Sequence, residues 1–392
     1  MARLSLLWAL AGAASALMAA APPKPPVGLP PYVQAYEPHT VDERGMWMEA
    51  DEYERRLRDS PLLIRDEGLT HYVQRVLCQT VGEARCKSVR IYVLEVPAFN
   101  ASMMPNGAMT VWSGLLLRVR NEAELGAVLG HEFAHFELRH SLNGFKQRRS
   151  ATDVMAWASV LGGLARTNTG DLQNLLVASI FRFNREQEQA ADMLSLQYLA
   201  ASPYPAMAAA QLWQNEMDEA DATAIGRKQK PRQRYSSGFF DTHPTDLKRA
   251  VYLGAAAAKL GDVGDPAAAG HRTAIASELP MLLKDQIGLN DFGGTDHILG
   301  QLATNGGWSG DLLYARGELY RSRGNPRDLV TAAQFYGEAL KAGYTAPEVQ
   351  RGLGLSLLRS GQVTDGKAAL AEYLRQRPGA NDAKTISALV QD

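Results

Sequence analysis

His131-Glu132-Phe133-Ala134-His135 is the stretch from which the fold and chemistry of this 392-residue chain can be worked out. It lies in a segment predicted to be helical from Asn121 to about His140. Residues i and i+4 of a helix lie nearly above one another, so the two histidines converge on one ion. Catalytic zinc takes about three protein ligands and keeps one position for water. Glu132 projects beside that water and is the candidate general base.

The third ligand must come from another part of the chain. A metzincin-type site needs glycine three residues after His135 and histidine three residues later, but Leu138 and Ser141 stand there. A thermolysin-type site needs a glutamate roughly twenty residues on, and no Glu occurs between Glu137 and Glu186. The candidates therefore lie in the acidic cluster that begins at Glu186.

That cluster lies in a long helix predicted from Leu172 to Leu199. Glu188 and Asp192 are i and i+4, so one carboxylate can bind the ion while the other orients a ligand histidine. Glu186 is about two helical positions away and is the weaker candidate. An exposed acidic helix turn is the alternative, but the two alanines before Asp192 favour tight packing.

Three motifs, taken in order, resemble one family of proteases. They are His131 to His135, Arg185-x-x-Glu188-x-x-Ala191-Asp192, and Thr242-His243-Pro244 with Arg249. Over roughly residues 59–253 the chain is similar to the gluzincin zinc metallopeptidases that include HtpX, the CAAX prenyl endopeptidase, mitochondrial Oma and periplasmic BepA. One departure is Asn184, where the family usually has serine.

The resemblance implies a role for each matching residue. His131, His135 and Glu188 bind one zinc ion per chain, Glu132 is the general base, and Asp192 supports the ligands from behind. It also implies that an extended substrate adds to an edge strand, namely the strand after Asn106-Gly107.

Two residues of the third motif have open roles. His243 could stabilise the tetrahedral oxyanion, occupy the fourth zinc position and hold the enzyme inactive, or be packed only for structure. Arg249 could clamp a carboxylate or oxyanion, or pair with Asp246.

The remaining pattern predicts a mainly α protein with a small β-sheet (α+β). Helices are expected from Asp42 to about Leu57 and from Asp59-Ser60-Pro61 onward to Leu77. Strands are expected at 88–96 and 108–112, and a buried helix at 154–165. A zincin-type metallopeptidase domain is predicted at 42–260.

Weak internal repeats predict a second region at 275–392. Gly317 and Gly354 are 37 residues apart, as are Gly324 and Gly361. Each unit reads as a helical hairpin of the tetratricopeptide or Sel1-like type. Two clear units are too few for a free-standing solenoid, so they are expected to stack on the preceding helical segment.

The amino terminus and the cysteines indicate export. Residues 1–21 are typical of a signal peptide, with an uncleaved anchor helix as the alternative, and 22–41 form a proline-rich linker. Cys78 and Cys86, the only two cysteines, predict a small-loop disulfide, with two buried thiols as the alternative.

The expected function is that of an exported zinc endopeptidase. Its substrates would be unfolded or misassembled envelope proteins, with a protein partner at the repeats, in the periplasm of a Gram-negative bacterium. The alternatives are a periplasmic chaperone or assembly factor with a latent metal site, and a maturation protease for one defined partner. A net charge of −1 argues against nucleic acid, and no membrane span is expected in the mature chain.

Overall fold

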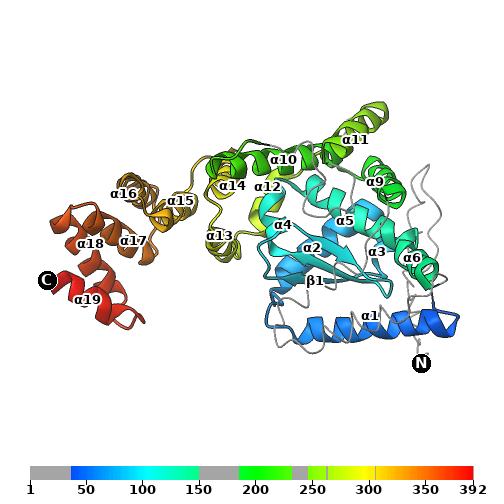
Figure 1. Cartoon of the computed structure of the whole chain (residues 1–392), viewed down its shortest axis with the longest axis horizontal. Coiled ribbons are helices and arrows are strands. Elements are labelled where there is room, and N and C mark those ends of the chain that lie inside the picture. Colours follow the sequence, from blue (N-terminus) through cyan, green and yellow to red (C-terminus); the bar gives the residue numbers. More distant parts are fainter. Residues whose placement is uncertain (1–36, 150–184, 232–245, 262–263, 305, 392) are drawn as a thin grey trace, which may run out of the picture.

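The computed structural model describes residues 37–149, 185–231, 246–261, 264–304 and 306–391. Within these ranges the protein is mainly α-helical with one small sheet, as predicted (Figure 1). The predicted signal peptide, the helix at 154–165, residues 172–184 and His243 lie outside the described residues. None of the described helices has the length and apolar character needed to span a bilayer.

The sheet contains three strands in the order β1-β3-β2. β1 (Arg90–Leu94) pairs in parallel with β3 (Ala108–Trp112), and β2 (Ala101–Met103) pairs antiparallel with β3. The prediction that the strand after Asn106-Gly107 is an edge strand is therefore wrong, because β3 is central. β2 was not predicted from the sequence, because it has only three residues and no β-branched side chain. Within the described residues the outer edge of β2 has no paired strand.

The two faces of the sheet are covered by different helices. Side chains alternate along a strand, so Ile91 and Val93 join the main core, whereas Tyr92 and Leu94 face the other way. The second face is covered by α1 (Val41–Asp59), which packs Leu57 against Leu94 (Figure 1). The main core on the first face includes α2 (Glu67–Val81).

The helix predicted to open at Ser60-Pro61 begins six residues later than expected. The carboxylate of Asp66 caps α2 by accepting a hydrogen bond from the backbone N–H of Leu69 at 2.6 Å. The preceding segment lies along β1 instead, because Ile64 donates its N–H to the Val93 carbonyl at 2.9 Å. Contact with a strand distant in sequence overrides the local capping signal.

The central helix α5 (Glu122–Glu137) lies between α2 and α9 (Arg185–Ala200) and is buried along most of its length. Two glycines permit this close packing. A Cβ at Gly126 would lie 2.5 Å from Thr80 Oγ1 on α2, and one at Gly130 would lie 2.9 Å from Ser195 Oγ on α9. Larger residues at these positions would push apart the helices that carry the site residues.

The remaining helices of the amino-terminal part surround this core. They are α3 (Glu83–Cys86), α4 (Ser113–Arg118), α6 (His140–Arg149), α10 (Ala208–Gly226) and α11 (Asp246–Leu260).

The carboxy-terminal part continues from this core as a row of helices (Figure 1). They are α12 (Ala268–Ala274), α13 (Leu279–Gly288), α14 (Phe292–Thr304), α15 (Gly310–Arg323), α16 (Pro326–Lys341), α17 (Glu348–Arg359), α18 (Val363–Gln376) and α19 (Ala383–Gln391).

The pairs α15–α16 and α17–α18 are the two hairpins expected from the glycine spacing. A Cβ at Gly317 or Gly352 would lie within 2.7 Å of the buried Tyr336 ring, so small residues are required there. The main core extends through α13, α14 and α15 as far as Leu319, so these helices pack on the amino-terminal part.

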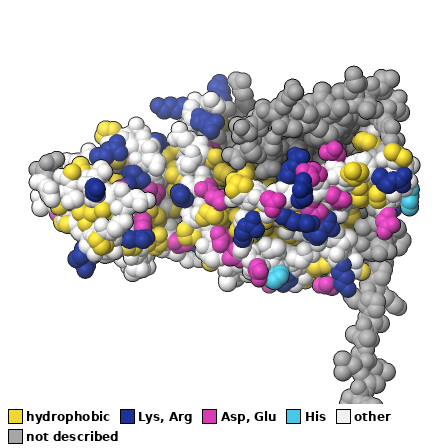
Figure 2. Space-filling view, turned by 90° about the horizontal axis from the view of Figure 1, so that it is seen from below, with side chains coloured by type: hydrophobic (Ala, Val, Ile, Leu, Met, Phe, Trp, Pro, Cys, Tyr) yellow, Lys and Arg dark blue, Asp and Glu magenta, His cyan; other side chains and the backbone are white. Residues whose placement is uncertain are grey.

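Surface charge is mixed on the face shown in Figure 2. Lys and Arg side chains alternate with Asp and Glu over both parts of the described chain, in keeping with a net charge of −1. No single-sign field dominates this face, so recognition must rest on local groups.

Cys78 on α2 and Cys86 at the end of α3 are joined by a disulfide in the structure. The double substitution Cys78→Ser/Cys86→Ser should lower the free energy of unfolding by about 2.5 kcal/mol, because it releases a short closed loop in the unfolded chain. Urea denaturation checks this, and wild type with dithiothreitol should match the variant. An unchanged unfolding free energy would contradict the prediction.

Candidate metal centre

Three donor side chains from two helices meet at one point. His131 and His135 come from α5 and Glu188 from α9, and their donor atoms lie within 4.8 Å of one another. The two Nε2 atoms are 3.1 Å apart. Glu188 places Oε2 3.4 Å from His131 Nε2 and Oε1 3.6 Å from His135 Nε2. The structure therefore brings together the three ligands implied by the resemblance.

The chemistry of this donor set fits zinc. Two imidazoles and one carboxylate form a common three-ligand set for catalytic zinc. Glu188 is fully buried and the histidines are 7% and 2% exposed. A buried carboxylate charge is costly unless it is paired or binds a cation, and a divalent ion would balance it here. Glu186, the weaker candidate, is exposed on α9.

Asp192 orients His131 from the side away from the other donors. Its Oδ1 lies 2.9 Å from His131 Nδ1. A proton on Nδ1 then leaves the lone pair of Nε2 directed at the metal position. Burial opposes the ionised carboxyl, but the charges of Arg249 and His131 hold the pKa of Asp192 well below its usual value.

Arg249 on α11 supports Asp192 in turn. The guanidinium pairs with both carboxylate oxygens, Nη2 to Oδ1 at 2.5 Å and Nε to Oδ2 at 2.8 Å. It also lies 3.7 Å over the Trp213 ring, and the Tyr252 hydroxyl donates to Asp192. Arg249 therefore pairs with Asp192, which was predicted to support a ligand but not to be the partner of Arg249, and it helps to hold His131 in place.

His140 orients His135 as Asp192 orients His131, and this role was not predicted from the sequence. Its Nδ1 lies 2.9 Å from His135 Nδ1, so one of the two nitrogens carries the proton. If His135 presents Nε2 to a metal, its Nδ1–H donates to His140. Arg139 has a φ of 55°, a turn that starts α6 beside the end of α5. Residues five positions apart do not share a helix face, so no local pattern in the sequence indicated this contact.

The candidate general base lies between the donors and the sheet. The carboxylate of Glu132 accepts a hydrogen bond from the backbone N–H of Met103 in β2, and burial raises the pKa of Glu132 to about 7. Asn100 and Met104 use their backbone groups to pair with β3. By alternation the N–H of Met103 points outward, so the edge of β2 that is unpaired within the described residues borders Glu132.

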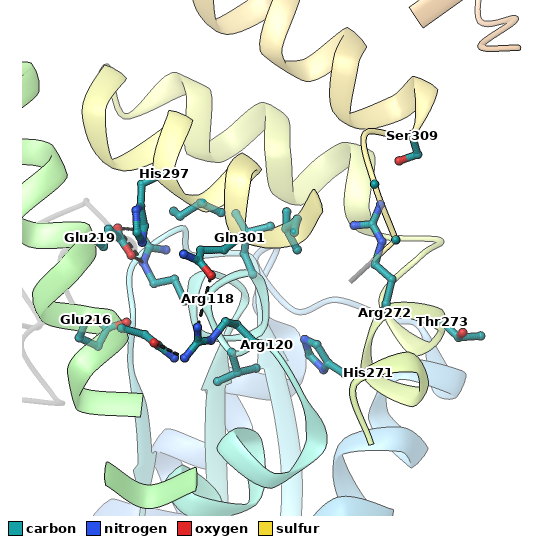
Figure 3. A pocket seen from close by; sticks show the side chains of 17 residues that line it. Arg118, Arg120, Glu216, Glu219, His271, Arg272, Thr273, His297, Gln301 and Ser309 are labelled. Atoms are coloured by element: carbon teal, nitrogen blue, oxygen red, sulfur yellow. Dashed lines mark hydrogen bonds and ion pairs between the residues drawn. The ribbon is translucent and has the colours of Figure 1, made fainter. Parts of the chain in front are cut away.

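A pocket formed by α10, α12, α14 and the α4–α5 connection contains none of these donors (Figure 3). Its arginines are engaged by neighbours. Arg118 donates to Glu219 at 2.8 Å and to Gln286 at 3.0 Å, and Arg120 donates to Gln301 at 3.3 Å. The pocket is therefore a polar junction between the two parts of the chain.

Asp192→Asn should weaken zinc binding by about 10- to 100-fold, because a neutral amide supports the His131 ligand less well. Competition with a chromogenic chelator measures this affinity. Glu219→Gln is the matched control, because Glu219 also pairs with two nitrogens of an arginine, Arg118, whose side chain is only 9% exposed. It should lower stability and leave zinc affinity unchanged. Equal zinc affinity in both variants would contradict the assigned role.

Comparisons with known proteins agree with this geometry. Residues 65–256 match peptidase family M48. The chain is 29% identical over 184 residues to mitochondrial metalloendopeptidase OMA1 of Schizosaccharomyces pombe, covering 46% of this chain and 50% of that protein. It is 29% identical over 180 residues to the β-barrel assembly-enhancing protease of Escherichia coli, covering 43% and 37%.

A third relative is metalloprotease LoiP of Escherichia coli, which is 31% identical over 160 residues, covering 39% of this chain and 57% of the relative. The matched part thus spans between about a third and a little over half of these relatives. The family match at residues 65–256 includes all three members of the donor set.

Proposed function

Because residues 65–256 are a peptidase family M48 domain, we propose that this protein is an exported zinc endopeptidase acting on unfolded or misassembled proteins of the cell envelope. The observation that carries the proposal is the buried donor set of His131, His135 and Glu188, with Glu132 between it and a free strand edge. Zinc bound there would supply Lewis acidity toward water and the scissile carbonyl.

The chain's own residues account for the proton transfers. Glu132 accepts the proton of the attacking water and returns it to the leaving amine. Asp192 and His140 hold the two histidines in the orientation that directs Nε2 at the metal position. Arg249 keeps Asp192 ionised beside His131.

An extended peptide is the substrate form that this site favours. The outer edge of β2 offers backbone groups for an added strand, and such pairing recognises main chain more than side chains. A folded protein has few free extended segments, whereas an unfolded chain has many. This supports a role in removing unfolded proteins, with the helical hairpins α15–α18 selecting the partner.

Export to the periplasm is supported by two observations. Residues 1–21 have the pattern of a signal peptide, and the only two cysteines form a disulfide, which persists in oxidising compartments. A role at the envelope is also in keeping with the name of one relative, the β-barrel assembly-enhancing protease.

The test is to measure zinc and hydrolysis on the same purified protein. We expect about one zinc per chain by mass spectrometry, and cleavage of a reduced, alkylated protein that stops with 1,10-phenanthroline and returns with added zinc. Absence of stoichiometric zinc would contradict the proposal. Bound zinc without any cleavage would favour an assembly factor acting through its repeats, or an enzyme awaiting activation.

A further inference from the structure

We propose that Arg85, Glu137 and Tyr198 form a brace that holds α5 and α9 in the relative position needed to retain the metal ion. The inference rests on the proposed zinc function, because it concerns how firmly the same donor set holds zinc. These three are positioning residues, since none of them belongs to the donor set.

The need for a brace follows from where the donors lie. His131 and His135 belong to α5, while Glu188 belongs to α9, so the donor distances depend on how the two helices sit relative to each other. A metal site tolerates errors of only about 0.2 Å in its ligand distances. Gly130 allows close contact in the middle of the helix pair, beside Ser195. The end of α5 beyond His135 requires a separate connection.

Glu137 and Tyr198 supply that connection. Glu137 is the last residue of α5, two positions after His135, and Tyr198 is near the end of α9. The Tyr198 hydroxyl donates a short hydrogen bond to Glu137 Oε2. The Tyr198 ring also packs edge-on against Phe133, with ring centroids 6.0 Å apart. One fully buried tyrosine thus contacts α5 on either side of His135.

Arg85 links the Glu137–Tyr198 contact to a third helix, α3. Its Nε lies 3.5 Å from both carboxylate oxygens of Glu137, and its guanidinium carbon lies 5.8 Å from the centre of the Tyr198 ring. The arginine is 3% exposed, so its charge requires a carboxylate partner. Its neighbour Cys86 is bonded to Cys78 on α2, which ties Arg85 to the core.

The opposite end of α5 carries the same chemistry and supplies a matched control. Arg75 Nη2 lies 2.6 Å from Glu122 Oε1, and the Tyr204 hydroxyl donates to Glu122 Oε2 at 2.8 Å. Glu122 is the first residue of α5, about 13 Å along the helix from His131. This second set joins α5 to α2 and to the segment that follows α9, without a metal donor beside it.

The experiment compares the two sets on the full-length zinc protein. The brace variants are Tyr198→Phe and Glu137→Gln, and the control variants are Tyr204→Phe and Glu122→Gln. Zinc release into a chromogenic chelator and the Tm are measured for each. We expect about 3- to 10-fold faster zinc release from the brace variants, below the effect of a direct ligand support. The controls should lower Tm with release rates within about 1.5-fold of wild type.

The zinc release rates decide whether the brace acts on metal retention or only on stability. Equal release rates in brace and control variants, whether both unchanged or both faster, would overturn the inference, because the brace would then only stabilise the fold. Two independent brace variants are included in case one fails to fold. Absence of zinc from the wild type would overturn the proposed function itself, which keeps the two failures distinct.

Discussion

Replacing Glu132 by glutamine should lower the rate of peptide hydrolysis by about 10²- to 10⁴-fold, the usual contribution of a positioned general base. Glutamine has nearly the same size, and its amide cannot accept a proton from water. Neither imidazole is altered, so the zinc content should remain near one ion per chain. Cleavage of the alkylated substrate and zinc content are measured on the same preparation.

The outcome separates two classes of function. An enzyme must lose cleavage with Glu132→Gln, whereas an assembly factor acting through α15–α19 should keep its partner binding unchanged. If the variant cleaved as fast as wild type with zinc bound, another group would have to be the base. Glu132 would then not be the general base, although it lies against the β2 edge.

Removing the third ligand should have the second large effect. We expect Glu188→Ala to lower zinc affinity by at least about 10³-fold, because it deletes one of three donors and the only carboxylate among them. The apo protein should not unfold more easily, since the substitution removes a buried charge rather than creating one. Zinc content after dialysis against a zinc-buffered solution measures the effect.

Glu186→Ala is the matched control for that experiment. Glu186 lies on the same helix two residues earlier, and its side chain is exposed where that of Glu188 is fully buried. The control should retain zinc at the wild-type level. Loss of zinc from Glu186→Ala, with retention in Glu188→Ala, would reverse the ligand assignment.

Elements with a strong local signal matched their predictions. The strand predicted at 108–112 is β3 with the same bounds, because a Pro-Asn-Gly turn and an apolar, β-branched run mark both of its limits. The helical stretch was predicted to begin at Asn121, and this residue caps α5 by accepting a hydrogen bond from the Glu124 N–H at 2.8 Å. Predictions failed where distant contacts decide, as for the short strand β2 and the start of α2.

The site residues divide in the same way, into those with a local sequence signal and those placed by distant contacts. The i, i+4 spacing was enough to predict two converging histidines, and the resemblance pointed to Glu188 and Asp192. No local pattern suggested that Arg249 would pair with Asp192, 57 residues earlier, or that His140 would turn back toward His135. These supports lie between elements and have no spacing rule of their own.

By itself, then, the sequence determined which residues share a helix face, because helical periodicity is a property of neighbouring residues. That was sufficient for the histidine pair, the general base and the candidate carboxylates. Only the tertiary structure decided how far α9 lies from α5, which strand has a free edge, and which buried charges support the ligands. Those features depend on packing between segments distant along the chain, where shape and burial outweigh local preference.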